Sequence, residues 1–342
     1  MIMTKTALLF SGQGSQYAEM GKELVEKFPS VKNLFALGSE IVGFDLRKVI
    51  NAGEFESTLT VQPAVYAVSL AALLCAKETG IQYAAAAGHS LGEYAALVAC
   101  GVIDAEEGFT IVKIRSTIMA RAGKKNPGSM AAVMGLEAEA VEAVCNELTE
   151  AGYYMAAVNF NSPLQTVIAG TEAGLAKAED ALKTAGAKRV VRLNVSAAFH
   201  SELMREAAEE FKKAIKSLPF KLPATPFYSN FTGGRLDDYA KIMKEVKFMP
   251  FSPTSMLNYL GTAGSRLKNA FEGMPEYLAS HLCSPVRFTD QLYAMEKDGF
   301  DAFLELGPGK VLSGLVKKTL PDATVCNIED LKSLEAAKGL LL

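Results

Sequence analysis

The chain has 342 residues, of which 49% are hydrophobic and 21% charged, the composition of an ordinary globular protein. Its formal net charge of −3 gives no electrostatic reason to expect nucleic acid or an anionic membrane as a partner. This length is large for a single compact domain, so we expect one large domain and a second, smaller one.

The first predicted element is a buried parallel strand at Thr6–Phe10, which is apolar on both faces. Residues 1–5 lead directly into this strand and lack the long apolar core of a signal peptide, so we expect no targeting segment. The strand ends at the glycine-rich loop Ser11–Gln16. This loop has room to bend near a ligand but lacks the full Gly-x-Gly-x-x-Gly pattern of a dinucleotide site. Helical patterns follow at residues 20–28, 34–42 and 61–77.

The most hydrophobic run, Val61–Ala76, carries Gln62 and Pro63 near its start and is too short to span a bilayer comfortably. We therefore expect a buried helix there and no membrane association. The cysteines lie far apart without a Cys-x-x-Cys motif, which argues against a zinc site and against a disulfide framework. This cysteine usage predicts the reducing cytoplasm as compartment. The five are Cys75, Cys100, Cys145, Cys283 and Cys326.

A nucleophile elbow is predicted at Gly88-His89-Ser90-Leu91-Gly92, between the apolar run Tyr83–Ala87 and a helical pattern from Glu93. Such an elbow needs glycine two residues before and two after the serine, because a Cβ there would clash with the closely approaching backbone. Chance alone gives Gly-x-Ser-x-Gly in roughly one chain in ten of this length. The change from strand to helix at Ser90 is what favours the elbow over chance.

Residues 128–196 have the order strand, helix, strand, strand, helix, strand, which is the ferredoxin-like order. Such a unit, complete in itself and placed within the larger alternation of strands and helices, predicts a small inserted domain. We expect an α/β fold with a parallel sheet in residues 1–127 and 198–342, and the insertion at 128–197. The cleft between the two is where we expect a ligand.

Prolines and glycines interrupt the chain repeatedly after residue 219, so residues 231–276 are predicted as surface loop with short helix. A last apolar strand is predicted at Phe300–Leu306. It ends at Gly307-Pro308-Gly309, and a helix is expected to follow.

A serine hydroxyl needs a base to remove its proton, and the chain has only three histidines. His200 follows the last strand of the inserted unit, where the chain returns to the cleft, and is the favoured base. His89 is adjacent to the serine and is expected to pack behind the elbow, since neighbouring side chains diverge at a sharp turn. His281 lies in a less regular region, and a structural or surface histidine is the alternative at each position.

Arg115 lies in the middle of the apolar stripe of a helix predicted at residues 106–122. A guanidinium is almost never buried without a partner, so it either pairs with an internal carboxylate or binds an anionic ligand. Arginine can bind a substrate carboxylate through two parallel hydrogen bonds.

Seven segments in order resemble the malonyl-CoA:acyl carrier protein transacylases, to which the acyltransferase domains of polyketide synthases are closely related. The resemblance covers nearly the whole chain. It is carried by residues 10–16, residues 88–93, Arg115, residues 159–163, residues 198–201, residues 284–288 and residues 305–309. It implies a large α/β-hydrolase-like domain with a ferredoxin-like insertion, the arrangement that the order of elements predicts independently.

The resemblance also implies roles for single residues. Ser90 is implied as the acylated nucleophile and His200 as its base, oriented by a backbone carbonyl because no aspartate is placed as a third member. The backbone N–H groups of Gln13 and Leu91 are implied as the oxyanion hole, and Arg115 as the group that holds the malonyl carboxylate.

Three further residues are implied to contact the substrate. Phe199 would crowd an α-methyl group and so favour malonyl over methylmalonyl, and Asn161 would line the thioester channel. His281 stands where discrete transacylases usually have glutamine or asparagine, at a position that helps to orient the acyl carboxylate or the catalytic histidine. The segment 231–280 is longer than in typical members.

The reaction implied is transfer of a malonyl group from coenzyme A to the phosphopantetheine thiol of an acyl carrier protein, through a seryl ester. No metal or cofactor is required. A serine thioesterase or other hydrolase would use the same serine and histidine, and a catalytically idle docking protein for fatty-acid or polyketide enzymes is a further alternative. The sequence does not distinguish fatty-acid from polyketide synthesis, and it leaves the oligomeric state open.

Overall fold

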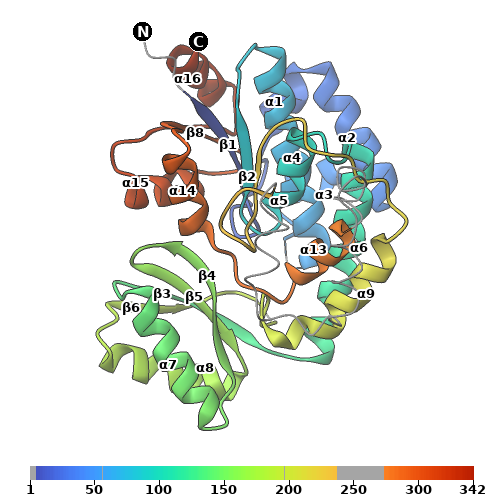
Figure 1. Cartoon of the computed structure of the whole chain (residues 1–342). Helices are drawn as coiled ribbons and strands as arrows, with labels where there is room; N and C mark the ends of the chain where they lie inside the picture. Colours follow the sequence, from blue (N-terminus) through green and yellow to red (C-terminus); the bar gives the residue numbers. More distant parts are fainter. Residues whose placement is uncertain (1–4, 56, 196, 237–272) are drawn as a thin grey trace, which may run out of the picture.

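The computed structural model describes residues 5–55, 57–195, 197–236 and 273–342, and contains two β-sheets (Figure 1). The larger sheet has five parallel strands in the order β7-β2-β1-β8-β9. Its strands are β1 (Thr6–Phe10), β2 (Ala85–Gly88), β7 (Phe227–Tyr228), β8 (Ala302–Leu306) and β9 (Thr324–Ile328). The chain therefore has an α/β fold with a parallel sheet, as predicted.

Helices cover both faces of this sheet, because alternate residues of its strands point to opposite sides. Leu8 and Phe10 of β1 belong to a core formed with α2, α4, α5, α6 and α9. Ala7 and Leu9 belong to a second core formed with α14 and α15. The bounds are α2 (Pro29–Val42), α4 (Thr58–Glu78), α5 (Gly92–Ala99), α6 (Ala105–Lys125), α9 (Arg205–Ile215), α14 (Phe288–Lys297) and α15 (Val311–Thr319).

The remaining helices are short or lie at the edges of this body. They are α1 (Lys22–Lys27), α3 (Leu46–Ala52), the 3-10 helix η1 (Glu202–Met204), α13 (Met274–Ser280) and α16 (Leu331–Leu341).

Helix α4 is long and apolar enough to cross a membrane by length and composition, but 83% of its most apolar window is buried inside the protein. It packs against α6, α2 and α5, so it is a helix of the core, as the sequence predicts for Val61–Ala76. Pro63 lies inside this helix, where its missing N–H removes the hydrogen bond to the carbonyl of Leu59.

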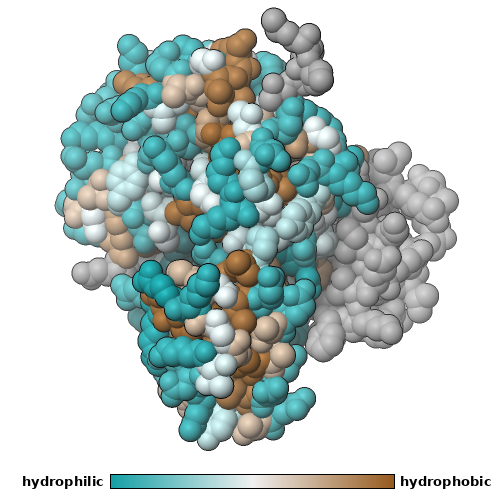
Figure 2. Space-filling model, turned by 90° about the vertical axis from the view of Figure 1, so that its left-hand side faces the viewer, coloured by the Kyte–Doolittle hydropathy of each residue, from teal (hydrophilic) through white to brown (hydrophobic). Residues whose placement is uncertain are grey.

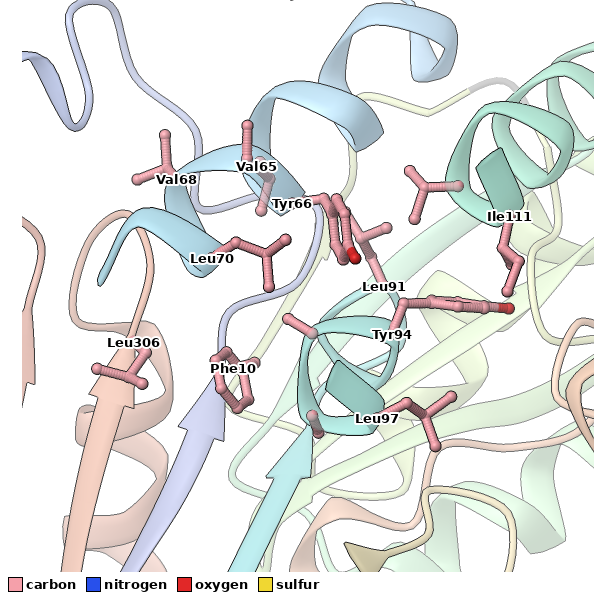
Figure 3. Close-up of a cluster of buried hydrophobic side chains, with 14 of the residues drawn as sticks. Phe10, Val65, Tyr66, Val68, Leu70, Leu91, Tyr94, Leu97, Ile111 and Leu306 are labelled. Carbon is pink, nitrogen blue, oxygen red and sulfur yellow. The ribbon is translucent and has the colours of Figure 1, made fainter. Parts of the chain in front are cut away.

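The core beneath the predicted elbow is drawn in Figure 3. Phe10 of β1 and Leu306 of β8 lie at the ends of their strands, below Leu70 of α4 in this view, and belong to the same cluster as Leu97 of α5. Register pairs Phe10 with both Gly88 and Leu306, so β1, β2 and β8 end at the same level. The loops that follow these strands therefore meet at one edge of the sheet, where ligands bind in parallel α/β proteins.

The second sheet has four antiparallel strands in the order β4-β5-β3-β6. Together with two helices these strands form a lobe below the larger body in Figure 1, and Figure 2 shows hydrophobic residues there in separate patches among hydrophilic ones. The six elements have the predicted order. They are β3 (Ser129–Met134), α7 (Ala138–Glu150), β4 (Met155–Ser162), β5 (Gln165–Gly170), α8 (Glu172–Thr184) and β6 (Arg189–Arg192).

One prediction about the strands is wrong. The strand predicted at Phe300–Leu306 is β8, but it is not the last, because β9 follows it. Among the described strands, β9 pairs with β8 alone, at the sheet edge, and it is half-buried over most of its length. It therefore lacks the continuous apolar run of a central strand. The predicted loop at residues 231–276 lies mostly outside the described residues.

Candidate active site

Ser90 lies at the sharp turn between β2 and α5, with its backbone in the left-handed region at φ 51°. The two flanking glycines are required by close approach, as the sequence predicts. An ideal Cβ on Gly88 would lie 2.1 Å from the carbonyl carbon of Gly92, and one on Gly92 would lie 2.0 Å from the carbonyl oxygen of Phe10. The turn therefore has the geometry of a nucleophile elbow.

His200 is the histidine that meets the serine, although 110 positions separate them in the chain. Its Nε2 lies 2.8 Å from Ser90 Oγ, and its Nδ1 lies 2.9 Å from the carbonyl oxygen of His281. Because a carbonyl oxygen only accepts, the hydrogen of a neutral His200 is on Nδ1, and Nε2 presents its lone pair to the hydroxyl. The imidazole is thus placed to act as a general base, oriented by a backbone carbonyl.

Burial lowers the pKa of His200 well below its usual range, and positive charge at His281 and Arg115 lowers this pKa further. The cause is physical: a buried imidazolium at His200 would lose its hydration and would be repelled by a charge on His281 and by the guanidinium of Arg115. His200 is therefore neutral at neutral pH, the state in which it can take a proton.

Arg115 is only 1% exposed, in helix α6, which begins at a capping box formed by Asp104 and Glu107. Its Nη2 donates to Ser90 Oγ over 3.1 Å, and its guanidinium lies 5.4 Å from the ring centroid of Tyr94. Within the described ranges, no carboxylate pairs with it, and its Nε has no hydrogen-bond partner. The sequence left two partners open for Arg115, an internal carboxylate and an anionic ligand. The described residues do not provide the internal carboxylate.

A cavity of about 270 Å³ lies between the two sheets, over the ends of β1 and β2. Both parts of the protein line it. The larger body contributes Gln13, Gln62, Ser90, Arg115 and His200, and the antiparallel sheet contributes Met130, Ala132, Asn159, Asn161 and Val167.

Two backbone N–H groups near the serine are available for a ligand. Gln13 lies in the loop after β1 and lines the cavity, and Leu91 follows the serine at the start of α5. Among the described residues, neither N–H has an internal hydrogen-bond partner. Gly12 makes the approach of this loop possible, since a Cβ there would lie 2.5 Å from the carbonyl oxygen of His89.

His89 does not pack behind the elbow, as the sequence suggested, but lines the cavity. Its Nε2 lies 2.8 Å from Asn161 Oδ1, which also lines the cavity, and its ring meets that of Phe288 edge-on. The prediction failed because the partner of His89 is Asn161, which lies on the antiparallel sheet, 72 positions away in the chain. Phe199 lines the cavity as well.

The side chain of His281 is fully buried and does not line the cavity. It lies between Glu93 and Asn230, and its side chain is not placed to contact a ligand in the cavity. Only its backbone carbonyl reaches the site, through the contact with His200.

Sequence reasoning missed two polar residues of this region. Gln62 is buried in α4, lines the cavity, and has an Oε1 without a partner among the described residues. A lone amide in the most apolar run of the chain is the signal that could have found it. Asn230 accepts the Ser90 N–H over 2.6 Å with its Oδ1, and no local pattern points to it.

The described residues offer little to a metal ion. Across the described ranges, no group of three or more His, Cys, Asp or Glu side chains is placed to hold one. All five cysteines fall in this part of the chain and are free thiols.

Comparison with known proteins gives a consistent result. Residues 7–337 match the model of the acyl transferase domain family. The malonyl CoA-acyl carrier protein transacylase of Bacillus subtilis (strain 168) is 37% identical over 338 residues, which cover 98% of this chain and 96% of the relative. That of Escherichia coli (strain K12) is 33% identical over 342 residues, covering 99% and 100%.

Solved structures agree in fold over the whole length. MCAT from Streptococcus pneumoniae superposes with a TM-score of 0.84 at 33% identity, covering 98% of this chain and 100% of that chain. A malonyl-transacylase in complex with its holo type II PKS acyl-carrier protein has a TM-score of 0.84 and 33% identity, with the same coverage. Family model, relatives and structures all extend over nearly the full chain, and on this basis the chain belongs to the family of malonyl-CoA:acyl carrier protein transacylases.

Proposed function

We propose that this chain moves a malonyl group from coenzyme A to the phosphopantetheine thiol of an acyl carrier protein, through a malonyl ester of Ser90. The observation that carries the proposal is the buried Arg115 guanidinium, 3.1 Å from Ser90 Oγ and without a carboxylate partner in the described ranges. Such a group suits an acyl chain that ends in a carboxylate.

In the first half of the reaction, His200 Nε2 takes the proton of Ser90 Oγ, and the oxygen attacks the thioester carbonyl of malonyl-CoA. The negative charge on the carbonyl oxygen is stabilised by the N–H groups of Gln13 and Leu91. The C–S bond then breaks, and His200 returns the proton to the departing thiolate of coenzyme A. A malonyl-seryl ester remains, and Arg115 holds its free carboxylate.

In the second half, the thiol of the carrier protein loses its proton to His200 and attacks the ester carbonyl. The same two N–H groups stabilise the second oxyanion, and the Ser90 oxygen regains a proton as the malonyl thioester leaves. Because the two substrates react in turn with one site, ping-pong kinetics follow. No step uses a metal ion or an organic cofactor.

Two residues that line the cavity have proposed roles in binding the acyl thioester. The Phe199 ring would crowd an α-methyl group, which favours malonyl over methylmalonyl groups. Asn161 lines the channel of the thioester and holds His89 through the 2.8 Å contact.

The domain organisation is part of the proposal. Residues 1–127 and 198–342 form an α/β-hydrolase-like domain, and residues 128–197 form a ferredoxin-like insertion that covers the serine. The parallel and antiparallel sheets and the order of the six inserted elements support this division. Action in the cytoplasm on a fatty-acid or polyketide carrier protein completes the proposal.

Intact protein mass after mixing with malonyl-CoA tests the function. We expect a malonyl adduct on the wild type that disappears when holo-carrier protein is added, and no adduct on Ser90→Ala. A wild type that never forms the adduct would favour a docking protein. An adduct that water removes as fast as the carrier protein would favour the thioesterase or hydrolase alternative.

A further inference from the structure

A closed polar cluster lies behind the serine and the catalytic imidazole, and the reaction above does not use it. Its members are Glu93 of α5, Tyr277 of α13, His281 at the end of α13 and Asn230 of the loop after β7, all at most 1% exposed. Polar groups that are buried together are expected to pair with one another through hydrogen bonds or opposite charges.

The contacts of Asn230 fix which of its two side-chain atoms faces His281. Its Nδ2 donates to the carbonyl oxygen of Gly88, and its Oδ1 accepts the N–H of Ser90 over 2.6 Å. The His281 Nε2 lies 3.2 Å from the same Oδ1. An amide oxygen only accepts, so His281 Nε2 carries a hydrogen.

The other ring nitrogen of His281 also faces an oxygen. Its Nδ1 lies 2.8 Å from Glu93 Oε2, and neither atom makes a directed hydrogen bond to a described residue. The second oxygen of Glu93 accepts from the N–H of Asn230 over 2.9 Å and from the hydroxyl of Tyr277. Because no hydrogen bond is directed along the 2.8 Å contact, attraction between opposite charges accounts for it better than a neutral hydrogen bond does. Such attraction requires an ionised Glu93 and a His281 with hydrogens on both ring nitrogens.

We propose that His281 is a positioning residue, held as the doubly protonated imidazolium between Glu93 and Asn230. In this state it anchors Asn230, which holds the N–H of Ser90, and it places a fixed positive charge behind His200. The proposal deepens the function proposed above and rests on it for the part that concerns the reaction.

The first consequence concerns the elbow. Ser90 has a left-handed backbone, which a residue other than glycine adopts only when its surroundings hold it there. The 2.6 Å bond from its N–H to Asn230 is one such contact, and it uses the oxygen that His281 also approaches. Loss of the donor at His281 therefore removes one of the contacts that hold the Asn230 side chain, and we expect it to loosen the serine.

The second consequence concerns the base. The ring centroids of His200 and His281 lie 5.4 Å apart, and the other ionisable groups that face His200 are Arg115 and, more distantly, His89. Glu93 contacts Nδ1 of His281 over 2.8 Å and compensates part of its charge. A positive charge at this distance disfavours a second one on His200 and so keeps the base neutral.

Wild-type protein tests the protonation state directly, because the chain has only three histidines. Nitrogen-15 NMR of untagged, histidine-labelled protein at pH 7.5 is expected to show one ring with both nitrogens protonated. His281→Gln is expected to remove that signal, and Glu93→Gln to weaken or abolish its double protonation. A wild-type spectrum in which all three rings are neutral overturns the proposal, whatever the enzyme activity turns out to be.

The role in the reaction is tested by the rate of Ser90 acylation as a function of pH. Acylation needs neutral His200, so its rate falls as pH drops through the pKa of His200. His281→Gln keeps a donor to Asn230 but removes the charge, so that pKa rises and the acidic limb moves up by roughly one pH unit. The KM for malonyl-CoA is expected to stay unchanged, since His281 does not line the cavity.

Two further variants separate charge from hydrogen bonding. His281→Leu removes the donor as well as the charge, so acylation is expected to slow by roughly tenfold relative to His281→Gln. Gln291→Asn changes an equally buried amide in α14 and controls for disturbance of the core. It should change neither the position of the acidic limb nor the rate of acylation. An acidic limb that stays in place in His281→Gln overturns the electrostatic role. Equal rates in His281→Gln and His281→Leu overturn the anchoring role.

Discussion

Arg115 is a buried cation without a carboxylate partner among the described residues. Its guanidinium is buried beside Ser90, and the described residues supply it with an aromatic face at Tyr94 but with no carboxylate. Burial lowers the pKa of the guanidinium, because the charged form has lost its water. A substrate carboxylate would supply the charge partner that the described residues do not provide.

The Arg115→Ala variant is therefore expected to lose selectivity rather than catalysis as such. We expect kcat/KM for malonyl-CoA to fall by about a hundredfold or more, which is the effect of losing a bidentate charge-assisted contact. The value for acetyl-CoA, which has no carboxylate, should change by less than about threefold. Acylation rates with the two thioesters provide the measurement.

Arg121→Ala is the matched control, because Arg121 lies in the same helix but is exposed and pairs with Glu210. It should leave both values unchanged. A malonyl-to-acetyl ratio in Arg115→Ala equal to that of the wild type would remove the assigned role of Arg115.

At the scale of elements, the elbow depends on close contact between β1, β2 and α5. Gly88 and Gly92 allow the turn to lie against its own helix and against the end of β1. The same turn places Ser90 at the N-terminal end of α5, where the free N–H groups and the helix dipole favour developing negative charge.

Gly92→Ala is expected to destabilise the protein strongly, since its Cβ would lie 2.0 Å from the carbonyl oxygen of Phe10 and backbone must move. We expect a loss of about 3 kcal/mol or more in the free energy of unfolding. Thermal and denaturant unfolding of the purified variant measure this loss.

A second glycine-to-alanine change serves as control, because it should not lower the free energy of unfolding. Gly339 lies inside α16 with open space around the position of a Cβ, so Gly339→Ala should be neutral or stabilise by up to about 1 kcal/mol. Equal unfolding temperatures for the two variants would show that the close approach at Gly92 is not what determines the turn.

At the scale of the whole molecule, residues of the antiparallel sheet and residues of the larger body line one cavity that includes Ser90. The antiparallel sheet has a core of its own with α7 and α8, built around Val133, Val141, Ile168 and Leu175. The other face of that sheet, which includes Met130, joins the core of the larger body.

This arrangement predicts that residues 128–197 fold when expressed alone. The fragment is expected to show mixed helical and strand circular dichroism and a cooperative thermal transition, at a lower temperature than the full chain. The lower temperature follows because the face around Met130 becomes exposed and so small a domain buries little surface. A fragment without a cooperative transition would contradict the proposed domain boundary.

Sequence alone determined the features that depend on neighbours along the chain. Glycine spacing around Ser90, the apolar stripe that contains Arg115, and the alternation of strands and helices are local patterns, because turn sterics and helical periodicity act over a few residues. The sequence did not predict strand β9, because this edge strand is only half-buried and has no continuous apolar run.

Tertiary structure decided which distant groups meet. It brought His200 to Ser90, turned His89 toward Asn161, and enclosed His281 with Glu93. Hydrogen bonds and charges act through space over a few ångströms, so a histidine has the same local sequence signal whether it becomes a base, lines a cavity or holds a buried charge. Only the folded chain sets the distances and the burial that distinguish these roles.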